Sequence, residues 1–244
     1  MRSPQEAPMS ENGEAPLIRA DRVRVSRRIP RKHNIRFRER LAATKVIAIL
    51  RADDTEYFAD AAHVLHDSGI PVLEAALTTP GALDAIGLMQ AELGPDCMIG
   101  AGSVRTPSDV DVAVLAGADF LVTPTCSPEV LERAQAYAVP VVCGALTPTE
   151  IDTAWRRGAA AVKVFPVAQV GGPDYISAVR APLPEIPLVP TGGVALSDVD
   201  AYLGAGAFAV AAASPLTGDA LCGGSLDALA ARGAQFAALA GKYV

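Results

Sequence analysis

From Lys45 onward, short apolar runs alternate with longer amphipathic segments, and this alternation constrains the fold more than any other feature of the 244-residue chain. Continuous apolar runs are typical of strands that are buried on both faces of a parallel sheet. The amphipathic segments between them have helical periodicity. The eight predicted strands are Lys45–Arg51, Val72–Leu77, Met98–Val104, Phe120–Thr123, Val139–Cys143, Ala160–Phe165, Leu188–Pro190 and Ala207–Ala213.

The helical segments also carry start and stop signals. A Ser or Thr followed by Pro caps the first turn of a helix, and this pair occurs at Thr106–Pro107, Ser127–Pro128 and Thr147–Pro148. Glycines are predicted to end helices at Gly69, Gly117, Gly158 and Gly206. The predicted helices include Glu56–Ser68, Pro107–Ala116, Pro128–Ala136, Pro148–Arg157 and Ser197–Gly204.

Eight right-handed parallel units close most simply into a (β/α)8 TIM barrel, so the predicted fold class is α/β with a single barrel domain over residues 41–244. The alternative is an open doubly wound sheet, which usually carries a Gly-rich dinucleotide loop after its first strand. Here Ala52 and Asp53 follow the first strand, and no such loop occurs. The sequence therefore favours the barrel.

Residues 1–40 are predicted to form an N-terminal arm, disordered to partly helical. Residues 1–18 are rich in Pro, Glu, Ser and Gly, which is typical of disorder. Residues 19–40 contain ten Lys or Arg and two acids, whereas residues 41–244 contain ten bases and twenty-two acids. We expect a solvated arm or a short helix, about residues 34–43, that covers the bottom of the barrel. The Arg cluster has no series of aromatic residues for stacking, so it is only a weak signal of a nucleic-acid or membrane contact.

Several function classes find no support in the sequence. No apolar run is long enough to span a bilayer, and the first residues lack the pattern of a secretory signal. The four cysteines have no metal-clip spacing, which favours a reducing, cytoplasmic location. His63 and His66 are three residues apart on a predicted helix without a third ligand, so we expect surface or packing roles, and no metal or cofactor.

Two charged residues interrupt the apolar strands. Lys163 lies in the sixth strand and Glu74 in the second. In a barrel, functional residues lie at the carboxyl ends of strands. Burial disfavours the charged form of an amine, so Lys163 is the predicted Schiff-base nucleophile and Glu74 the predicted general acid/base. The structural alternative is a buried ion pair between the two.

Other strand ends supply predicted binding groups. Arg51 ends the first strand and suits a carboxylate, although a surface ion pair with Asp53 or Asp54 is the alternative. Ser103 follows the glycines of the third strand and offers a hydroxyl. The loops after strands seven and eight are the usual phosphate site of a barrel. The predicted cradle there consists of Gly192, Gly193 and Ser214.

Together these residues resemble the 2-keto-3-deoxy-6-phosphogluconate / 4-hydroxy-2-oxoglutarate aldolase family from Lys45 to the C-terminus. The matching pieces are VIAILR, VLEAALTTPGAL, IGAGSV, GALTPTEI, AVKVFP and PTGGV. The resemblance implies a (β/α)8 barrel, commonly trimeric, that uses a lysine Schiff base and no metal. It assigns the Schiff base to Lys163, the acid/base role to Glu74 and the binding of the pyruvyl carboxylate to Ser103. It also implies that Pro124 lines the pocket and that Phe165 packs near the imine.

The implied activity is that of a lyase in the Entner–Doudoroff pathway. It would cleave 2-keto-3-deoxy-6-phosphogluconate, 4-hydroxy-2-oxoglutarate or both to pyruvate and an aldehyde. Three positions depart from the family pattern: Thr78 where some members have a substrate-contacting Arg, Cys143 where Pro commonly precedes Gly144, and Ala213 where Gly precedes the last-strand Ser. The requirement for a C6 phosphate therefore stays open. The alternative functions are a non-catalytic sugar-phosphate-binding barrel and another phosphate-binding barrel enzyme, such as an epimerase or synthase.

Overall fold

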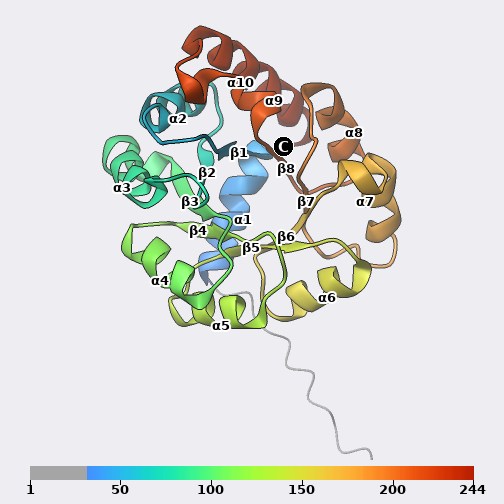
Figure 1. Cartoon of the computed structure of the whole chain (residues 1–244). Coiled ribbons are helices and arrows are strands. Elements are labelled where there is room, and N and C mark those ends of the chain that lie inside the picture. The colour runs from blue at the N-terminus through green and yellow to red at the C-terminus, as the bar shows by residue number, and fades with distance from the viewer. Residues whose placement is uncertain (1–31) are drawn as a thin grey trace, which may run out of the picture.

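A computed structural model describes residues 32–244, which fold into a (β/α)8 barrel (Figure 1). All neighbouring strands that pair are parallel, in the order β7-β6-β5-β4-β3-β2-β1-β8. The ring closes between β7 and β8 through a parallel bridge of Thr191 with Ala211. The strands are β1 (Val46–Leu50), β2 (Val72–Ala76), β3 (Met98–Gly102), β4 (Phe120–Val122), β5 (Val141–Ala145), β6 (Ala161–Val164), β7 (Leu188–Pro190) and β8 (Val210–Ala212).

Helices surround this ring, and three of them begin at the predicted residues, Pro107, Pro128 and Pro148. The hydroxyls of Thr106, Ser127 and Thr147 accept hydrogen bonds from backbone N–H groups of the first turns of α4, α5 and α6. The four glycines predicted to end helices all have φ between 87° and 93°. The helices are α1 (Lys32–Thr44), α2 (Phe58–Asp67), α3 (Ala82–Leu93), α4 (Pro107–Leu115), α5 (Pro128–Ala136), α6 (Pro148–Arg156), α7 (Gly172–Arg180), α8 (Val199–Gly204), α9 (Ser214–Thr217) and α10 (Leu226–Ala240).

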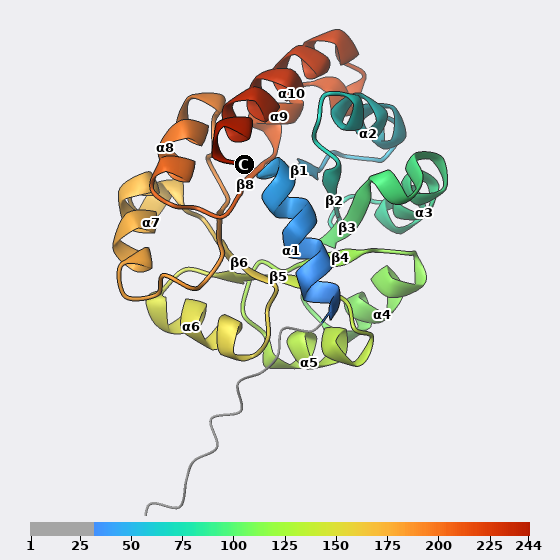
Figure 2. The ribbon, with the colours of Figure 1, turned by 180° about the vertical axis from the view of Figure 1, so that it is seen from behind.

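Helix α1 covers the end of the barrel at which the strands begin. It lies behind the strands in Figure 1 and in front of them in Figure 2. Its Phe37 and Leu41 are fully buried and belong to the apolar cluster that fills the barrel interior. The ring of Phe37 lies 5.0 Å from that of Phe120 on β4. The opposite end, where the strands finish, is therefore the end available for a site.

Several boundaries differ from the sequence prediction, and β8 begins at Val210 rather than at Ala207. Strand β5 begins at Val141, two residues later than predicted, because the N–H of Val139 donates to Ala134 O and completes α5. Helix α1 runs over Lys32–Thr44, so it crosses the predicted boundary between arm and barrel at residue 40. The predicted disorder of residues 1–18 and most of the basic arm lie outside the described residues.

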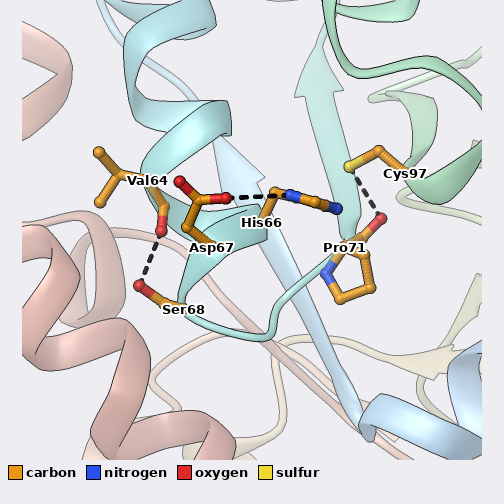
Figure 3. A network of polar contacts seen from close by, with 6 residues as sticks. All are labelled: Val64, His66, Asp67, Ser68, Pro71 and Cys97. Atoms are coloured by element: carbon orange, nitrogen blue, oxygen red, sulfur yellow. Dashed lines mark hydrogen bonds and ion pairs between the residues drawn. The ribbon is translucent and has the colours of Figure 1, made fainter.

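The histidines of α2 lie outside the barrel and pair locally. His63 Nε2 lies 3.1 Å from a carboxylate oxygen of Glu92, and His66 Nδ1 lies 3.3 Å from Asp67. Figure 3 shows His66 and Asp67 near the start of β2, where the Cys97 thiol donates to Pro71 O. These contacts agree with the predicted surface and packing roles.

The burial of Phe37 of α1 inside the barrel predicts that truncating this side chain lowers stability strongly. Truncating Phe37 to Ala removes a fully buried ring and leaves a cavity that the barrel interior cannot fill. We expect the free energy of unfolding to fall by about 3–5 kcal/mol in urea denaturation. Ile35→Ala is the control because Ile35 lies on the same helix but is 38% exposed. Equal effects of the two variants would contradict the burial of Phe37.

Candidate active site

Lys163 and Glu74 both lie on the inner face of the barrel. Each comes two residues after an interior apolar residue of its own strand, Ala161 on β6 and Val72 on β2, and side chains two apart share a face. Strands β2 and β6 are four apart in a ring of eight, so the two side chains face each other across the interior. Lys163 is 5% exposed and Glu74 is 1% exposed. The predicted catalytic pair is thus shielded from bulk water.

The carboxylate of Glu74 is buried without a partner. Within residues 32–244, neither carboxylate oxygen accepts a hydrogen bond, and no ion pair joins Glu74 to Lys163. Buried polar groups in proteins are nearly always hydrogen-bonded, and an unpaired one is costly. The structural alternative, a buried ion pair, is therefore not formed. An unpaired carboxylate and a buried amine are instead free to interact with a bound molecule.

Glycines on neighbouring strands make room for the site. A Cβ at position 102 would overlap Oε1 of Glu74, so the Glu74 side chain occupies space that only Gly102 leaves open. Gly144 pairs with Lys163 in the register of β5 and β6. A Cβ at Gly144 would overlap the backbone of Pro124. Gly102 on β3 thus makes room for the carboxylate of Glu74, and Gly144 on β5 makes room for the loop after β4.

A buried threonine fixes the loop that carries Pro124. The hydroxyl of Thr123 accepts a hydrogen bond from Gly144 N at 2.9 Å and donates one to Thr125 O at 2.8 Å. Thr123 is 1% exposed. This arrangement holds Pro124 against Gly144, the neighbour of Lys163 in the sheet. We did not predict this positioning role of Thr123, although its place directly after a strand was a usable signal.

Phe165 connects the lysine to the loop after β7. The Lys163 Nζ atom lies 5.2 Å from the centroid of the Phe165 ring. A Cβ at Gly192 would lie 3.0 Å from the same ring, so the missing side chain lets the ring and the loop pack closely. The bridge between Thr191 and Ala211 brings this loop beside the residues that precede Ser214. The predicted cradle of Gly192, Gly193 and Ser214 is thus assembled from adjacent strand ends.

Arg51 and Ser103 come together at the ends of β1 and β3. The Arg51 Nη2 atom donates to Ser103 Oγ at 3.4 Å. Arg51 forms no ion pair with Asp53 or Asp54. Ser103 has φ 59°, an uncommon conformation for a residue with a side chain. Such strained residues cluster at functional sites, and here one carries a hydroxyl beside a guanidinium.

A buried threonine joins the loops after β1 and β2. It is Thr79, the neighbour of the predicted binding residue Thr78. Thr78 is exposed, whereas Thr79 is 1% exposed and its hydroxyl accepts a hydrogen bond from Ala52 N at 3.3 Å. This bond ties the loop after Arg51 to the loop after Glu74. Two identical neighbours in the sequence gave no signal to distinguish them.

A pair of cysteines lies at the loop after β4, which also carries Pro124. The Cys143 thiol on β5 hydrogen-bonds to Cys126, and this bond lowers the pKa of Cys126 to about 7 while it raises the pKa of Cys143. By contrast, burial raises the pKa of Cys97 to about 11. The contact between these two cysteines, the sulfur pair, depends on Cys143, one of the positions at which the sequence departs from the pattern of the family it resembles.

The contact between Cys126 and Cys143 predicts that the reactivity of the Cys126 thiol depends on pH near neutrality. The thiolate is the nucleophile, so alkylation of Cys126 by iodoacetamide should be slow below pH 7 and fast above it, with a midpoint near 7. Cys143→Ala removes the hydrogen bond and should move the midpoint up toward about 8.5. Peptide mass spectrometry measures both rates, with the exposed Cys222 as an internal control. An unchanged midpoint in Cys143→Ala would contradict this assignment.

Known proteins match this sequence and this fold. The KDPG and KHG aldolase family matches residues 37–231. A 2-dehydro-3-deoxy-phosphogluconate aldolase of Haemophilus influenzae is 34% identical over 165 residues, which cover 68% of this chain and 77% of the relative. A 4-hydroxy-2-oxoglutarate aldolase/2-deydro-3-deoxyphosphogluconate aldolase from TTHB1 is 32% identical with a TM-score of 0.75, covering 83% of this chain and 97% of that one.

A further solved structure contains a covalent intermediate. The KDPG aldolase from Legionella pneumophila, with pyruvate captured as a covalent carbinolamine intermediate, is 28% identical with a TM-score of 0.71. It covers 84% of this chain and 96% of that one. With a family match over most of its length and the barrel, the buried lysine and the glycine-rich strand ends in place, the chain belongs to the KDPG and KHG aldolase family.

Proposed function

We propose that this protein is a class I aldolase that cleaves 2-keto-3-deoxy-6-phosphogluconate, 4-hydroxy-2-oxoglutarate or both to pyruvate and an aldehyde. The observation that carries the proposal is the buried amine of Lys163 facing the unpaired buried carboxylate of Glu74. Relatives named for these substrates support the assignment. The match to their family makes the chain a lyase.

The reaction begins with covalent capture. The neutral amine of Lys163 attacks the C2 carbonyl of the 2-keto acid, and loss of water gives an iminium. Burial keeps bulk water away from the amine and from the carbon that it attacks. The positive iminium then accepts the electrons of the bond that breaks. This electron sink is the reason that we propose a metal-independent mechanism.

Glu74 moves the protons. Its carboxylate takes the proton of the C4 hydroxyl, directly or through a water, and the C3–C4 bond breaks to release the aldehyde. The electrons of that bond form the enamine at C3. Glu74 returns the proton to C3, and hydrolysis of the resulting imine releases pyruvate and the free amine of Lys163. Proton and electron pair are thus both returned.

The remaining predicted residues bind the ends of the substrate. Ser103, with Arg51 beside it, suits the pyruvyl carboxylate because a hydroxyl and a guanidinium both donate to carboxylate oxygens. Gly192, Gly193 and Ser214 suit a phosphate at the far end of a C6 substrate. We assign the wall of the pocket to Phe165, whose ring lies 5.2 Å from the Lys163 Nζ atom, and to Pro124, which lies against Gly144. Thr78 is exposed at the rim, where it has no charge to offer a substrate.

We also propose the setting of this activity. A pyruvate-forming cleavage of a phosphorylated sugar acid fits the Entner–Doudoroff pathway in the cytoplasm, and the four free thiols agree with a reducing compartment. No described helix is long and apolar enough to cross a membrane. A homotrimer is the proposed assembly, on the basis of the family resemblance.

Borohydride trapping tests the nucleophile. Incubation with pyruvate and sodium borohydride should add one reduced pyruvyl adduct to the peptide that contains Lys163. Lys163→Ala should keep its melting transition but lose both the adduct and cleavage, measured as pyruvate release with a lactate dehydrogenase couple. Lys242→Ala is the control because Lys242 is an exposed lysine paired with Asp200. Adduct on another lysine, or activity retained in Lys163→Ala, would refute the mechanism and favour a binding protein or another barrel enzyme.

Gly102→Ala tests the placement of Glu74. The added methyl must displace the carboxylate, so we expect kcat for cleavage to fall about a hundredfold, within the range of general acid–base contributions. Trapping of pyruvate on Lys163 should persist because that side chain lies across the barrel. Gly87→Ala is the matched control, since its methyl would make only an ordinary contact 3.7 Å from Ala116 O. An unchanged kcat in Gly102→Ala would mean that the position of Glu74 does not limit the reaction.

A further inference from the structure

A recess lies at the end of the barrel where the strands begin, opposite the residues proposed for catalysis. Its volume is about 350 Å³, and it is lined by residues that precede strands, including Lys45 before β1 and Pro187 before β7. Arg38 of α1 and Arg180 at the end of α7 complete its wall. The recess is therefore separate from the site proposed for catalysis.

Three cations gather in this recess without a carboxylate partner. Arg38, Lys45 and Arg180 form no ion pair and no side-chain hydrogen bond within residues 32–244. Residues 41–244 nevertheless carry more than twice as many acids as bases. Three arginines elsewhere do pair with acids: Arg133 with Asp111 at 2.6 Å, Arg156 with Asp152 at 2.7 Å and Arg157 with Glu132 at 3.7 Å.

The three cations are held in place rather than loosely solvated. All three side chains are half-buried. The Lys45 Nζ atom lies 5.1 Å from the centroid of the Phe208 ring, and the guanidinium of Arg38 lies 5.6 Å from the Trp155 ring. Burial lowers the pKa of both Arg38 and Lys45, because it takes part of each charged group out of water. A bound anion would offset this cost.

Arg180 depends on a neighbouring glycine for its position. Its Nε atom lies where a Cβ at Gly206 would approach to 2.6 Å. Gly206 has φ 89° and follows α8. The same glycine that ends a helix therefore also admits a guanidinium to the wall of the recess. The opposing charge among the lining residues is Glu185, which is exposed.

We propose that this recess is a binding site for a small phosphate monoester. Two guanidinium groups and an ammonium match the charge and the several acceptor oxygens of a phosphate, and a guanidinium can bind two of those oxygens at once. The volume of about 350 Å³ admits a phosphate with a short polar chain. The carboxylate of Glu185 can accept a hydrogen bond from a hydroxyl of that chain.

Phosphate binding at fixed ionic strength tests the site in the full-length protein. Inorganic phosphate and glycerol 3-phosphate are the probes, with chloride balancing the salt, and calorimetry and the melting temperature are the readouts. We expect Arg180→Gln and Arg38→Gln each to weaken binding about tenfold or more, since hydrogen bonds to charged groups are the strong ones. Arg40→Gln is the matched control, because Arg40 lies on α1 but donates to Pro95 O, outside this recess.

Kinetics separate this site from the phosphate cradle of the proposed active site. Arg180→Gln should leave the KM for the phosphorylated substrate, and the inhibition constant of phosphate against cleavage, unchanged. Two variants on different helices guard against a local folding defect, which the melting temperature without phosphate would reveal. Equal phosphate affinity in wild type, Arg180→Gln and Arg38→Gln would overturn the proposal, as would a loss of affinity in Arg40→Gln of the same size. Failure here would leave pyruvate trapping on Lys163 intact.

Discussion

The burial of an unpaired carboxylate inside the barrel is the constraint on which the rest of the structure depends. Glu74 is shielded from water and has no hydrogen-bond partner in the described chain. Such a group costs stability, commonly about 1–3 kcal/mol and more when it is charged. The rest of the barrel has to offset that cost. It does so with an apolar interior closed at one end by Phe37 and Leu41, so stability and chemistry occupy opposite ends of the same strands.

Glycine placement is the means by which the interior accommodates large side chains from neighbouring strands. At the lower layer of β3, a Cβ on Gly100 would lie 2.5 Å from the Phe120 ring, so an aromatic side chain fills that space. One layer higher, Gly102 leaves the space to Glu74. The interior therefore changes from apolar to reactive within two residues of one strand. Glycines on β3 therefore make room both for an aromatic ring of the core and for the carboxylate proposed as the acid/base group.

Much of this could be predicted from the sequence because its signals are local. Continuous apolar runs predicted the strands, and the charges at positions 74 and 163 stood out within them. The remainder depends on contacts between distant segments. Whether Thr78 or Thr79 turns inward depends on the path of a loop, and the pairing of Cys126 with Cys143 depends on two adjacent strand ends meeting in space. No periodicity in the sequence reports such contacts.

Helix α1 shows how one segment can serve two needs. Its apolar face supplies Phe37 and Leu41 to the interior, and its polar face supplies Arg38 to the recess beside the strand starts. A basic segment joined to an acidic barrel gains electrostatic attraction as well as apolar burial. Arg38 on this helix has no carboxylate partner among the described residues. Its guanidinium is instead held in place by half-burial over the ring of Trp155. Part of the positive charge that the sequence concentrates before the barrel thus lies on α1, where Arg38 contributes to the wall of the recess.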